Sequence, residues 1–560
     1  MLARCLSASL LGIDARPVTV EVDLAPGLPG LQLVGLPDTA IQESRERVRS
    51  ALRNSGFRGP LVKVVVNLAP ADLRKEGPCF DLPIALGLLI ASGQLDSPCL
   101  EGLWSAGELG LDGRLRPCRG ILAIACLAKS QGARGLLVAA EDAAEAALVK
   151  GLKVTAAASL KDLVNRLRAG DLVQTPAGQQ HQAPRGQCAA AERNAAPPPL
   201  NLPAQHLARQ GLALAAAGGH HLLMVGPPGC GKTLLAQQLP ALLPPLDDDE
   251  ALDITRLHSI AGLPRNEKHL IRQRPFRAPH HSASAAALLG GGANPRPGEL
   301  SLAHGGVLFL DELGEFPRAV LDQLRQPLEE GVLMLSRARV RCAFPCRVTL
   351  VAATNPCPCG WHGDPRCRCS ESQVKRYWHR MSGPLLDRLD LQLRLEPPAA
   401  DSLRQVIEER HGPIDRDPLP ETIEAARRQM HQRNPNGCCN RDLSTADLKR
   451  HGAFKSGTLT SWEQVLKARR LSLRSGLKLL KVSRTIADLA GQGDVTVEHL
   501  ATALCFRSFD EQTQDESADY SEILLLEPKL TPKTNDKGEL TTESFARSIT
   551  QVDQLLQQVG

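Results

Sequence analysis

The sequence is poor in aromatic residues, in long apolar runs and in net charge. Phenylalanine, tryptophan and tyrosine make up 3% of the 560 residues, which argues against base stacking as the main way of binding nucleic acid. The apolar stretch at residues 82–92 is shorter than the ~20 residues that a membrane-spanning helix needs. The chain has 66 basic and 61 acidic residues, so any basic surface must be local.

The sequence also lacks an N-terminal signal pattern, because Arg4, Asp14 and Arg16 interrupt the apolar residues there. We therefore expect a cytoplasmic protein with no membrane partner. In that compartment the sixteen cysteines are not expected to form disulfides. The length allows roughly three or four domains.

A glycine-rich segment lies between a short apolar run and a helix-like stretch. Its residues are Gly226, Pro227, Pro228, Gly229, Cys230, Gly231, Lys232 and Thr233. A strand, a glycine-rich loop and a helix in this order are typical of a P-loop, in which backbone N–H groups and the helix dipole bind phosphate. We expect Lys232 to reach the β- and γ-phosphates of ATP and Thr233 to bind Mg²⁺.

Two later apolar runs end in polar residues that suit ATP hydrolysis. The run at 305–312 ends in Asp311, which is expected to hold magnesium, and Glu312, which is expected to polarise the attacking water. The run at 350–356 contains Asn355, at the place where an AAA+ ATPase has the sensor-1 residue that helps to position this water.

Two arginines are candidates for contact with the γ-phosphate. Arg388, in the segment 382–390, is the candidate arginine finger, and a surface ion pair with Asp387 or Asp390 is the alternative. Residues 401–507 have a helical pattern that predicts a lid. Arg474 is the first candidate for a sensor-2 arginine there and Arg484 the second, unless both are surface arginines.

Several of these segments together resemble one bacterial family. Residues 275–281, 298–304 and 382–390 look like those of the YifB/ComM family of magnesium-chelatase-like AAA+ proteins, and the resemblance covers residues 1–508. It implies a hexameric ATPase that moves on DNA, with single-stranded and branched DNA and recombination proteins as partners. ComM proteins drive branch migration while incoming DNA is integrated by homologous recombination in natural transformation.

The first part of the chain resembles the proteolytic domain of Lon-type proteases. Residues 75–81 are similar to the segment with the nucleophilic serine, but Cys79 takes its place. Residues 107–122 are similar to the segment with the catalytic lysine, and Leu122 takes that position. A nucleophile needs a base or a lowered pKa, so we expect the fold without protease activity and Cys79 as a core thiol.

The resulting fold class is a multidomain α/β protein. We expect a Lon-like α+β domain of the ribosomal S5 domain 2 type, a P-loop AAA+ core and a helical lid. The expected boundaries are 1–170 for the Lon-like domain, 171–200 for a linker, 201–398 for the core, 399–508 for the lid and 509–560 for an acidic tail.

The segment 332–341 alternates and predicts a β-hairpin. Arg337, Arg339 and Arg341 recur at period two, hence on one face. Such a face suits a phosphate backbone without base readout, although an ordinary solvated strand is the alternative. The insertion 272–297, with Arg274 and Arg277, is a second candidate for DNA contact.

Four cysteines are clustered within the loop 357–369. Cys357, Cys359, Cys367 and Cys369 form two Cys-x-Cys pairs on a Gly/Pro-rich segment. We expect a structural zinc site with no open position, or else reduced free thiols. His362 is an alternative ligand, and the site would fix the loop directly after Asn355.

The sequence leaves other functions open. A chelatase-like or chaperone-like ATPase that remodels a protein partner would have the same core. An ATP-dependent protease is disfavoured by Leu122, and a non-enzymatic scaffold is disfavoured by the complete nucleotide-binding pattern.

Overall fold

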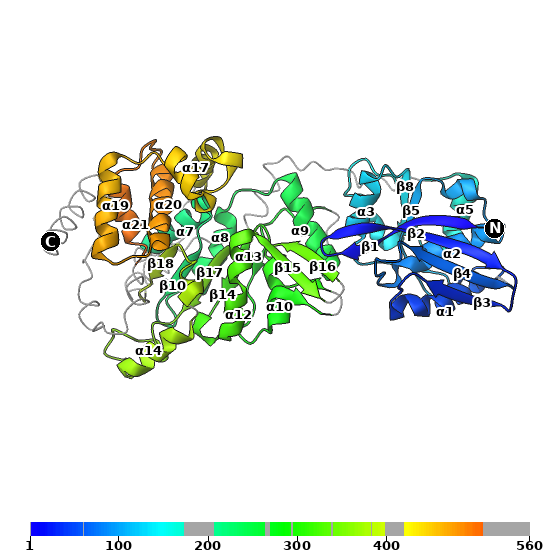
Figure 1. Cartoon of the computed structure of the whole chain (residues 1–560), viewed down its shortest axis with the longest axis horizontal. Helices are drawn as coiled ribbons and strands as arrows, with labels where there is room; N and C mark the ends of the chain where they lie inside the picture. Colours follow the sequence, from blue (N-terminus) through cyan, green and yellow to red (C-terminus); the bar gives the residue numbers. More distant parts are fainter. Residues whose placement is uncertain are drawn as a thin grey trace, which may run out of the picture.

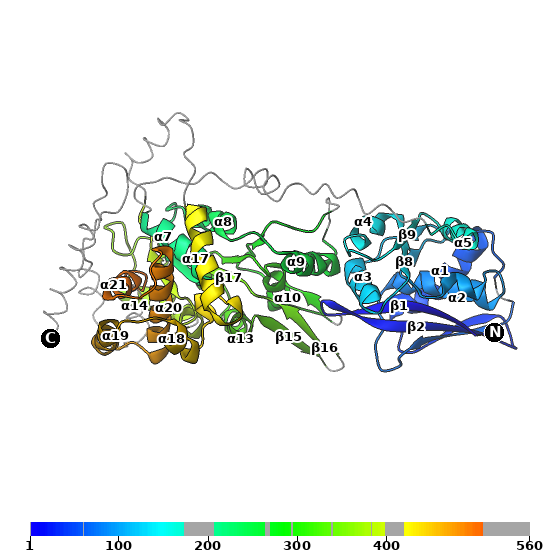
Figure 2. The same ribbon diagram turned by 90° about the horizontal axis from the view of Figure 1, so that it is seen from above.

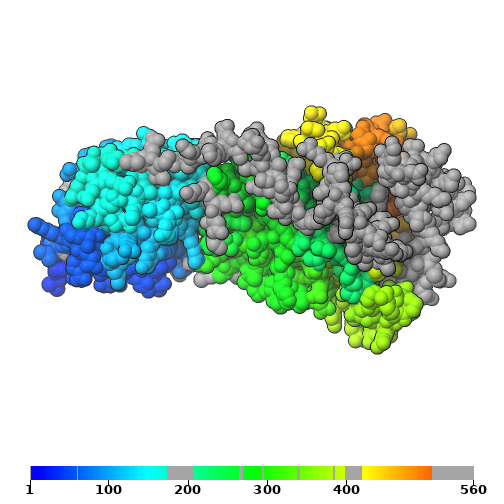
Figure 3. Space-filling view, turned by 180° about the vertical axis from the view of Figure 1, so that it is seen from behind, coloured from blue at the N-terminus to red at the C-terminus, as the bar shows by residue number. Residues whose placement is uncertain are grey.

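The computed structural model describes residues 2–59, 61–172, 206–263, 269–292, 295–337, 340–381, 383–397 and 419–507. The predicted linker, apart from residues 171 and 172, and the predicted tail at 509–560 lie outside these residues. Figures 1 and 2 show an elongated molecule with a front unit at one end, a central unit and a helical unit at the other end. Seen from behind in Figure 3, α14 (Glu371–Arg380) forms a protrusion beside the central unit.

The front unit, residues 2–172, is built on a mixed sheet of seven strands. Their order is β3-β4-β2-β1-β5-β8-β9. β1 pairs antiparallel with β2 and parallel with β5, and β5, β8 and β9 continue in parallel. The bounds are β1 Ala3–Leu11, β2 Asp14–Ala25, β3 Gly30–Val34, β4 Lys63–Ala69, β5 Leu103–Ser105, β8 Gly135–Ala139 and β9 Val154–Ala157.

Helices cover both faces of this sheet because its strands alternate between two cores. In β8, Leu137 and Ala139 face one core, whereas Leu136 and Val138 face the other. The first core holds α1, α2 and α5, and the second holds α3. The bounds are α1 Thr39–Asn54, α2 Asp81–Ala91, α3 Ile121–Ser130, α4 Ala143–Ala146 and α5 Leu160–Ala169.

The central unit contains a parallel five-stranded sheet in the order β11-β14-β17-β10-β18. Its strands are β10 Leu222–Val225, β11 Phe276–Arg277, β14 Val307–Leu310, β17 Thr349–Thr354 and β18 Leu391–Arg394. β17 is buried along its whole length, as expected for a strand covered on both faces. All carboxyl ends therefore meet at one edge of the sheet.

Helices pack on both faces of the central sheet. One face carries α7 and α8, while the other faces a core that includes α10 to α13. The bounds are α7 His206–Gly218, α8 Lys232–Leu242, α9 Asp248–Ala261, α10 Ala285–Leu289, α11 Glu299–Leu302, α12 Arg318–Gln323, α13 Arg325–Glu330 and α15 Gly383–Leu386.

The predicted hairpin is present, but its arginines do not share one face. The strands are β15 (Val332–Arg337) and β16 (Val340–Pro345), and Arg337 pairs with Val340 whereas Ser336 pairs with Arg341. Directly paired residues lie on the same face, and neighbours along a strand lie on opposite faces. The prediction of one arginine face was wrong, because the chain reverses between Arg337 and Arg341. Arg339 lies outside the described residues.

The helical pattern predicted for residues 401–507 is confirmed over the described part of that range, residues 419–507. The helices of the helical unit are α17 Leu419–Arg433, α18 Thr445–His451, α19 Ser456–Ala468, α20 Leu473–Leu489 and α21 Val497–Leu504. Apolar residues of α17, α20 and α21 share a core with α7 and with one face of the central sheet. Among the residues that the structure describes, no helix combines the length and the apolar character needed to cross a bilayer.

Candidate nucleotide site

The glycine-rich loop lies at the carboxyl edge of the central sheet, between β10 and α8. Gly229 and Gly231 have φ angles of 79° and 87°, a left-handed conformation that favours glycine. A Cβ on Gly226 would lie 2.7 Å from the carbonyl oxygen of Leu395 and 2.8 Å from Cys230 Sγ. The loop thus needs these glycines to pass close to the neighbouring backbone and leave a cradle for phosphate.

Lys232 and Thr233 begin α8 beside the polar residues of the neighbouring strands. Lys232 Nζ donates to the carbonyl oxygens of Gly226 (2.6 Å) and Pro227 (3.0 Å) and to Asn355 Oδ1 (3.2 Å). Thr233 Oγ1 donates to Asp311 Oδ2 over 3.1 Å. The structure therefore brings together four residues that the sequence predicts for one site.

Glu312, the residue predicted to polarise the attacking water, follows β14 in a left-handed conformation with φ 52°. This conformation is uncommon for a residue with a side chain. Glu312 Oε2 lies 3.0 Å from Nδ1 of His281. His281 also packs against the ring of His280 at 4.1 Å and against the edge of Phe316 at 6.5 Å between ring centroids. A histidine from the segment after β11 thus orients the Glu312 carboxylate.

The four clustered cysteines converge beside the glycine-rich loop. Their Sγ atoms all lie within 4.8 Å of one another, and the separations are 3.3 Å for Cys357–Cys359, 3.9 Å for Cys357–Cys367 and 3.6 Å for Cys359–Cys367. Such a group can hold a metal ion. Slight burial raises the pKa of the Cys359 thiol, but backbone N–H groups of Arg368 and Trp361 outweigh it and bring that pKa to about 6.

The cysteine loop packs directly on the glycine-rich loop. A Cβ added to Gly360, which lies between the two cysteine pairs, would be 2.7 Å from Cδ of Pro228. At the other end, Trp378 Nε1 donates to the carbonyl oxygen of Pro356 over 3.1 Å. The cysteine loop therefore shapes both Pro228 and the segment that follows Asn355.

The two candidate arginines lie together, away from the glycine-rich loop of their own chain. Arg388 lies just before β18, hence at the amino edge of the sheet, and Lys232 follows the carboxyl end of the adjacent β10. Four-residue strands separate the two edges by about 13 Å. Arg388 Nη2 lies 3.0 Å from Glu329 Oε1, and Arg474 contacts the same carboxylate oxygen.

Glu329 is thus shared by an arginine before β18 and an arginine at the start of α20. Partial burial acts to raise the pKa of its carboxyl group, but the contacts with Arg474 and Arg388 outweigh this and lower the pKa. Arg388 also donates from Nε to the carbonyl oxygen of Arg325 over 3.2 Å. The sequence left open an ion pair with Asp387 or Asp390, and the acidic partner found for Arg388 is Glu329.

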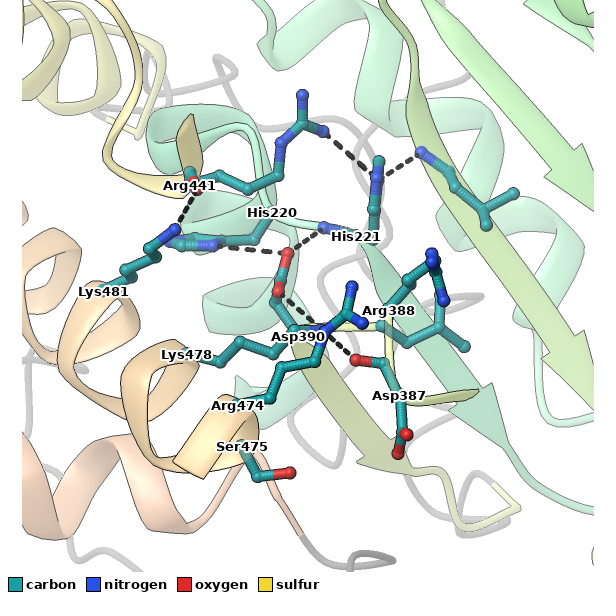
Figure 4. A network of polar contacts seen from close by, with 12 residues as sticks. His220, His221, Asp387, Arg388, Asp390, Arg441, Arg474, Ser475, Lys478 and Lys481 are labelled. Atoms are coloured by element: carbon teal, nitrogen blue, oxygen red, sulfur yellow. Dashed lines mark hydrogen bonds and ion pairs between the residues drawn. The ribbon is translucent and has the colours of Figure 1, made fainter. Parts of the chain in front are cut away.

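A buried polar network fixes this edge of the sheet to α20 (Figure 4). Asp390 accepts from the backbone N–H of His221 over 3.1 Å and pairs with Lys478 Nζ over 3.1 Å. His220 Nδ1 lies 3.7 Å from Asp390 Oδ2. Burial lowers the pKa of His221 well below its usual value. Lys478 also donates to the carbonyl oxygen of Asp387, so it ties the segment that carries Arg388 to the helical unit.

Arg484, the second candidate for the lid arginine, is not accessible to a nucleotide. Its side chain is completely buried and pairs with Asp488 over 3.0 Å. It also donates to the carbonyl oxygens of Gly452, Gly493 and Gln492. These contacts disfavour Arg484 as the nucleotide sensor, because the helical unit uses its guanidinium to hold α20 against adjoining loops.

The candidate DNA residues lie on or near the hairpin. Arg341 is exposed on β16, and Arg337 ends β15. In the second candidate segment, Arg277 makes a two-pronged pair with Glu299 at 2.6 and 2.7 Å. Arg274 is buried against Glu250. Arg274 and Arg277 are therefore used within the chain, and Arg341 is an exposed candidate for phosphate contact among the described side chains.

Sequence reasoning missed Glu329 and the role of His281. Glu329 lies in a short amphipathic helix with no motif around it, so only the fold reveals that it meets both arginines. His281 belongs to the Pro-His-His segment at 279–281, and two adjacent histidines before a small-residue stretch were the available signal.

Family models and relatives agree with this geometry. The model described as magnesium chelatase, subunit ChlI, matches residues 201–403, and models of further ChlI regions match residues 20–142 and 417–507. The competence protein ComM of Haemophilus influenzae is 42% identical over 512 residues, which cover 90% of this chain and 97% of that protein.

Two further relatives are similar over nearly their whole lengths. The uncharacterized protein YifB of Salmonella typhimurium is 41% identical over 89% of this chain and 96% of its own length. The uncharacterized protein Mb2921c of Mycobacterium bovis is 39% identical over 90% of this chain and 98% of its own length. The chain belongs to the YifB/ComM family of magnesium-chelatase-like AAA+ proteins.

Proposed function

We propose that this protein is an ATPase that assembles as a ring, completes its catalytic sites between neighbouring subunits and uses hydrolysis to move on DNA. The observation that carries the proposal is the division of the site. Lys232, Thr233, Asp311 and Asn355 meet at one edge of the central sheet, whereas Arg388 and Arg474 meet at the other.

The residues at the carboxyl edge fit ATP and magnesium. Gly229 and Gly231 hold the backbone in left-handed turns, and a Cβ on Gly229 would meet nothing within 4 Å, so this part of the cradle is open. Backbone N–H groups of the loop and Lys232 would hold the phosphates, and Thr233 with Asp311 would hold Mg²⁺. When bound, the metal neutralises charge on the phosphates.

The chemistry then depends on Glu312 and Asn355. Glu312 accepts a hydrogen bond from the attacking water and directs its lone pair to the γ-phosphate, with His281 holding the carboxylate in place. Asn355, which already contacts Lys232, orients the water and the lysine together. Positioning of this kind supplies most of the catalysis in phosphoryl transfer.

Arg388 and Arg474 would serve the nucleotide of a neighbouring subunit. Two arginines that converge on one carboxylate oxygen present the donors that a γ-phosphate oxygen needs in the transition state. In the single chain Glu329 occupies that position. A closed ring gives every subunit such a neighbour, and we propose a hexamer as the ring.

The hairpin β15–β16 is the proposed DNA contact. Arg341 is exposed on it, and the opposite part of β16 is anchored by the buried Cys342 and Phe344. An anchored hairpin with an exposed arginine suits phosphate contact without sequence readout. We propose single-stranded and branched DNA as substrates, with branch migration during recombination in natural transformation as the biological role and the cytoplasm as the location.

The cysteine cluster is proposed to hold a structural zinc ion. Four thiolates bound to zinc at ~2.3 Å in a tetrahedron would lie about 3.8 Å apart, close to the separations of 3.3 to 3.9 Å between three of the four sulfur atoms. His362 is not needed as a ligand, because four sulfur atoms complete the coordination.

The front unit is proposed to have a Lon-like fold without protease activity. Burial raises the pKa of the Cys79 thiol to about 12, so the thiolate that a nucleophile requires is scarcely formed at neutral pH. Leu122 is completely buried in the α3 core. Neither residue can supply the catalytic pair of a Lon protease.

A synthetic Holliday junction with labelled strands tests the proposed function. The purified protein with ATP and Mg²⁺ should convert this junction to forked products. A Glu312→Gln variant, which keeps the phosphate cradle, should bind ATP but leave the junction unconverted. ATPase activity that is indifferent to DNA, together with no branch migration, would refute the DNA motor and favour remodelling of a protein partner.

A further inference from the structure

We propose that the tip of the β1–β2 hairpin in the front unit braces the β15–β16 hairpin and sets its position on DNA. The tip consists of residues 11–14. This inference rests on the proposed function, because it gives the front unit a role in the same DNA-contacting element. Figures 1 and 2 both show the β1–β2 tip beside α9 and β16.

The first contact is apolar. Leu11 and Ile13 pack against a small core that contains Leu257 of α9 together with Cys342 and Phe344 of β16. These three core residues are at most 4% exposed. The side of β16 that faces the front unit is therefore desolvated by the tip, which stabilises the hairpin at this position.

The second contact brings two backbones together. Gly12, with φ 67°, lies so close to β16 that an added Cβ would be 2.9 Å from the carbonyl oxygen of Ala343 and 3.1 Å from Cβ of Cys342. Both the conformation and the space require glycine here. The tip thus lies flat against the middle of the strand that carries Arg341.

The third contact fixes the tip to α9. Arg256, whose side chain is 15% exposed, donates to the carbonyl oxygen of Ile13 over 2.9 Å and pairs with Asp14 over 2.6 Å. Farther along α9, Ile260 packs into the α3 core of the front unit. Apolar burial, backbone contact and an ion pair together hold the tip against α9 and β16. A single surface salt bridge would contribute much less stabilisation.

The brace also reaches the second insertion. Asp248, at the start of α9, pairs with Lys150 of the front unit over 3.3 Å and with Arg272 over 2.6 Å. Helix α9 therefore contacts the front unit and both segments that were predicted to approach DNA. The proposed consequence is that the front unit keeps β15–β16 at a fixed position through cycles of ATP binding and hydrolysis.

A double substitution of the tip tests the brace. Leu11→Ser with Ile13→Ser should leave nucleotide binding and basal ATPase unchanged, because neither residue is near Lys232. Stimulation of the ATPase by forked DNA should fall by about fivefold or more, as expected for a lost coupling between sites. Leu28→Ser is the matched control, since Leu28 is 90% exposed on the same unit and should keep full stimulation.

A charge exchange provides a second test that leaves the apolar contact intact. Asp14, whose side chain is 65% exposed, pairs with Arg256 over 2.6 Å, so Asp14→Arg should keep the fold and lower the stimulation of the ATPase by forked DNA. Adding Arg256→Asp restores a pair of opposite charges and should recover part of that stimulation.

The outcomes separate this inference from the proposed function. Unchanged stimulation in the double serine variant would overturn the brace, as would a charge exchange that recovers none of the stimulation lost in Asp14→Arg. Absence of DNA stimulation in the unsubstituted protein would instead refute the proposed function.

Discussion

Two inactive variants should regain activity when they are mixed. Lys232→Ala removes the phosphate contact of a subunit's own site, and Arg388→Ala removes the donor that it offers to its neighbour. Each variant alone should lose activity, the second by about 10³-fold or more because an arginine finger contributes this much to phosphoryl transfer. The two residues lie at opposite edges of the same sheet, so one chain does not supply both to one nucleotide.

The recovered activity can be worked out from this arrangement. A site is intact when the subunit with Lys232 lies on the correct side of a subunit with Arg388. In randomly mixed rings with equal amounts of both variants, about a quarter of the interfaces meet this condition. We therefore expect roughly a quarter of the activity of the unsubstituted protein, or less if neighbouring sites depend on one another.

The assay is steady-state ATP hydrolysis with forked DNA after the subunits are exchanged in nucleotide-free buffer. Mixing each single variant with a Lys232→Ala, Arg388→Ala double variant is the control, because neither mixture contains an interface with both Lys232 and Arg388. A mixture of the two single variants that stays as inactive as either one would refute the shared site. Recovery with the double variant in place of Lys232→Ala would refute the assignment of Arg388.

Three further predictions follow from contacts near the site and in the front unit. His281→Ala removes the imidazole that lies 3.0 Å from the Glu312 carboxylate. We expect kcat to fall about ten- to a hundredfold with little change in KM for ATP. A rise in KM as large as the fall in kcat would contradict a positioning role. Elemental analysis should find about one zinc ion per chain. The double substitution Cys359→Ser, Cys367→Ser should abolish the bound zinc. Cys505 is an exposed cysteine outside the cluster, so Cys505→Ser should leave the zinc content unchanged. Burial raises the pKa of Asp142 to about 7, so the folded state holds this proton more tightly than the unfolded state and loses stability as the pH rises from about 4 to 7. Asp142→Asn should therefore stabilise the protein more at pH 8 than at pH 5, by at most about 3 kcal/mol in the free energy of unfolding, with a correspondingly larger rise in Tm; an equal gain at both pH values would count against the shifted carboxyl.

The parallel central sheet and the half of the candidate site around Lys232 were predictable because their signals are local. Glycines at 226, 229 and 231 surround a loop whose backbone needs them, and the apolar runs before Asp311 and Asn355 are long enough to predict buried strands. The parallel sheet then brings the ends of those strands together without further information. Lys232, Thr233, Asp311 and Asn355 consequently meet as expected.

The remaining features depend on contacts between distant segments. Glu329 meets Arg388 and Arg474 only because α13, the segment before β18 and α20 converge at one edge. Periodicity in the hairpin was misleading, since a turn between Arg337 and Arg341 exchanges the faces that a continuous strand would keep. Arg484 resembles an exposed lid arginine by its position in the sequence, and only the fold shows that its side chain is buried.

The central claim is that neighbouring chains share each nucleotide site around a DNA-binding ring. Cryo-electron microscopy of the Glu312→Gln variant with ATP and forked DNA tests it most directly. We predict a closed ring in which Arg388 and Arg474 leave Glu329 and contact the γ-phosphate bound at Lys232 of the adjacent subunit, with Arg341 facing the DNA backbone in the pore. A ring in which both arginines remain on Glu329, or in which DNA lies outside the β15–β16 hairpins, would contradict the account.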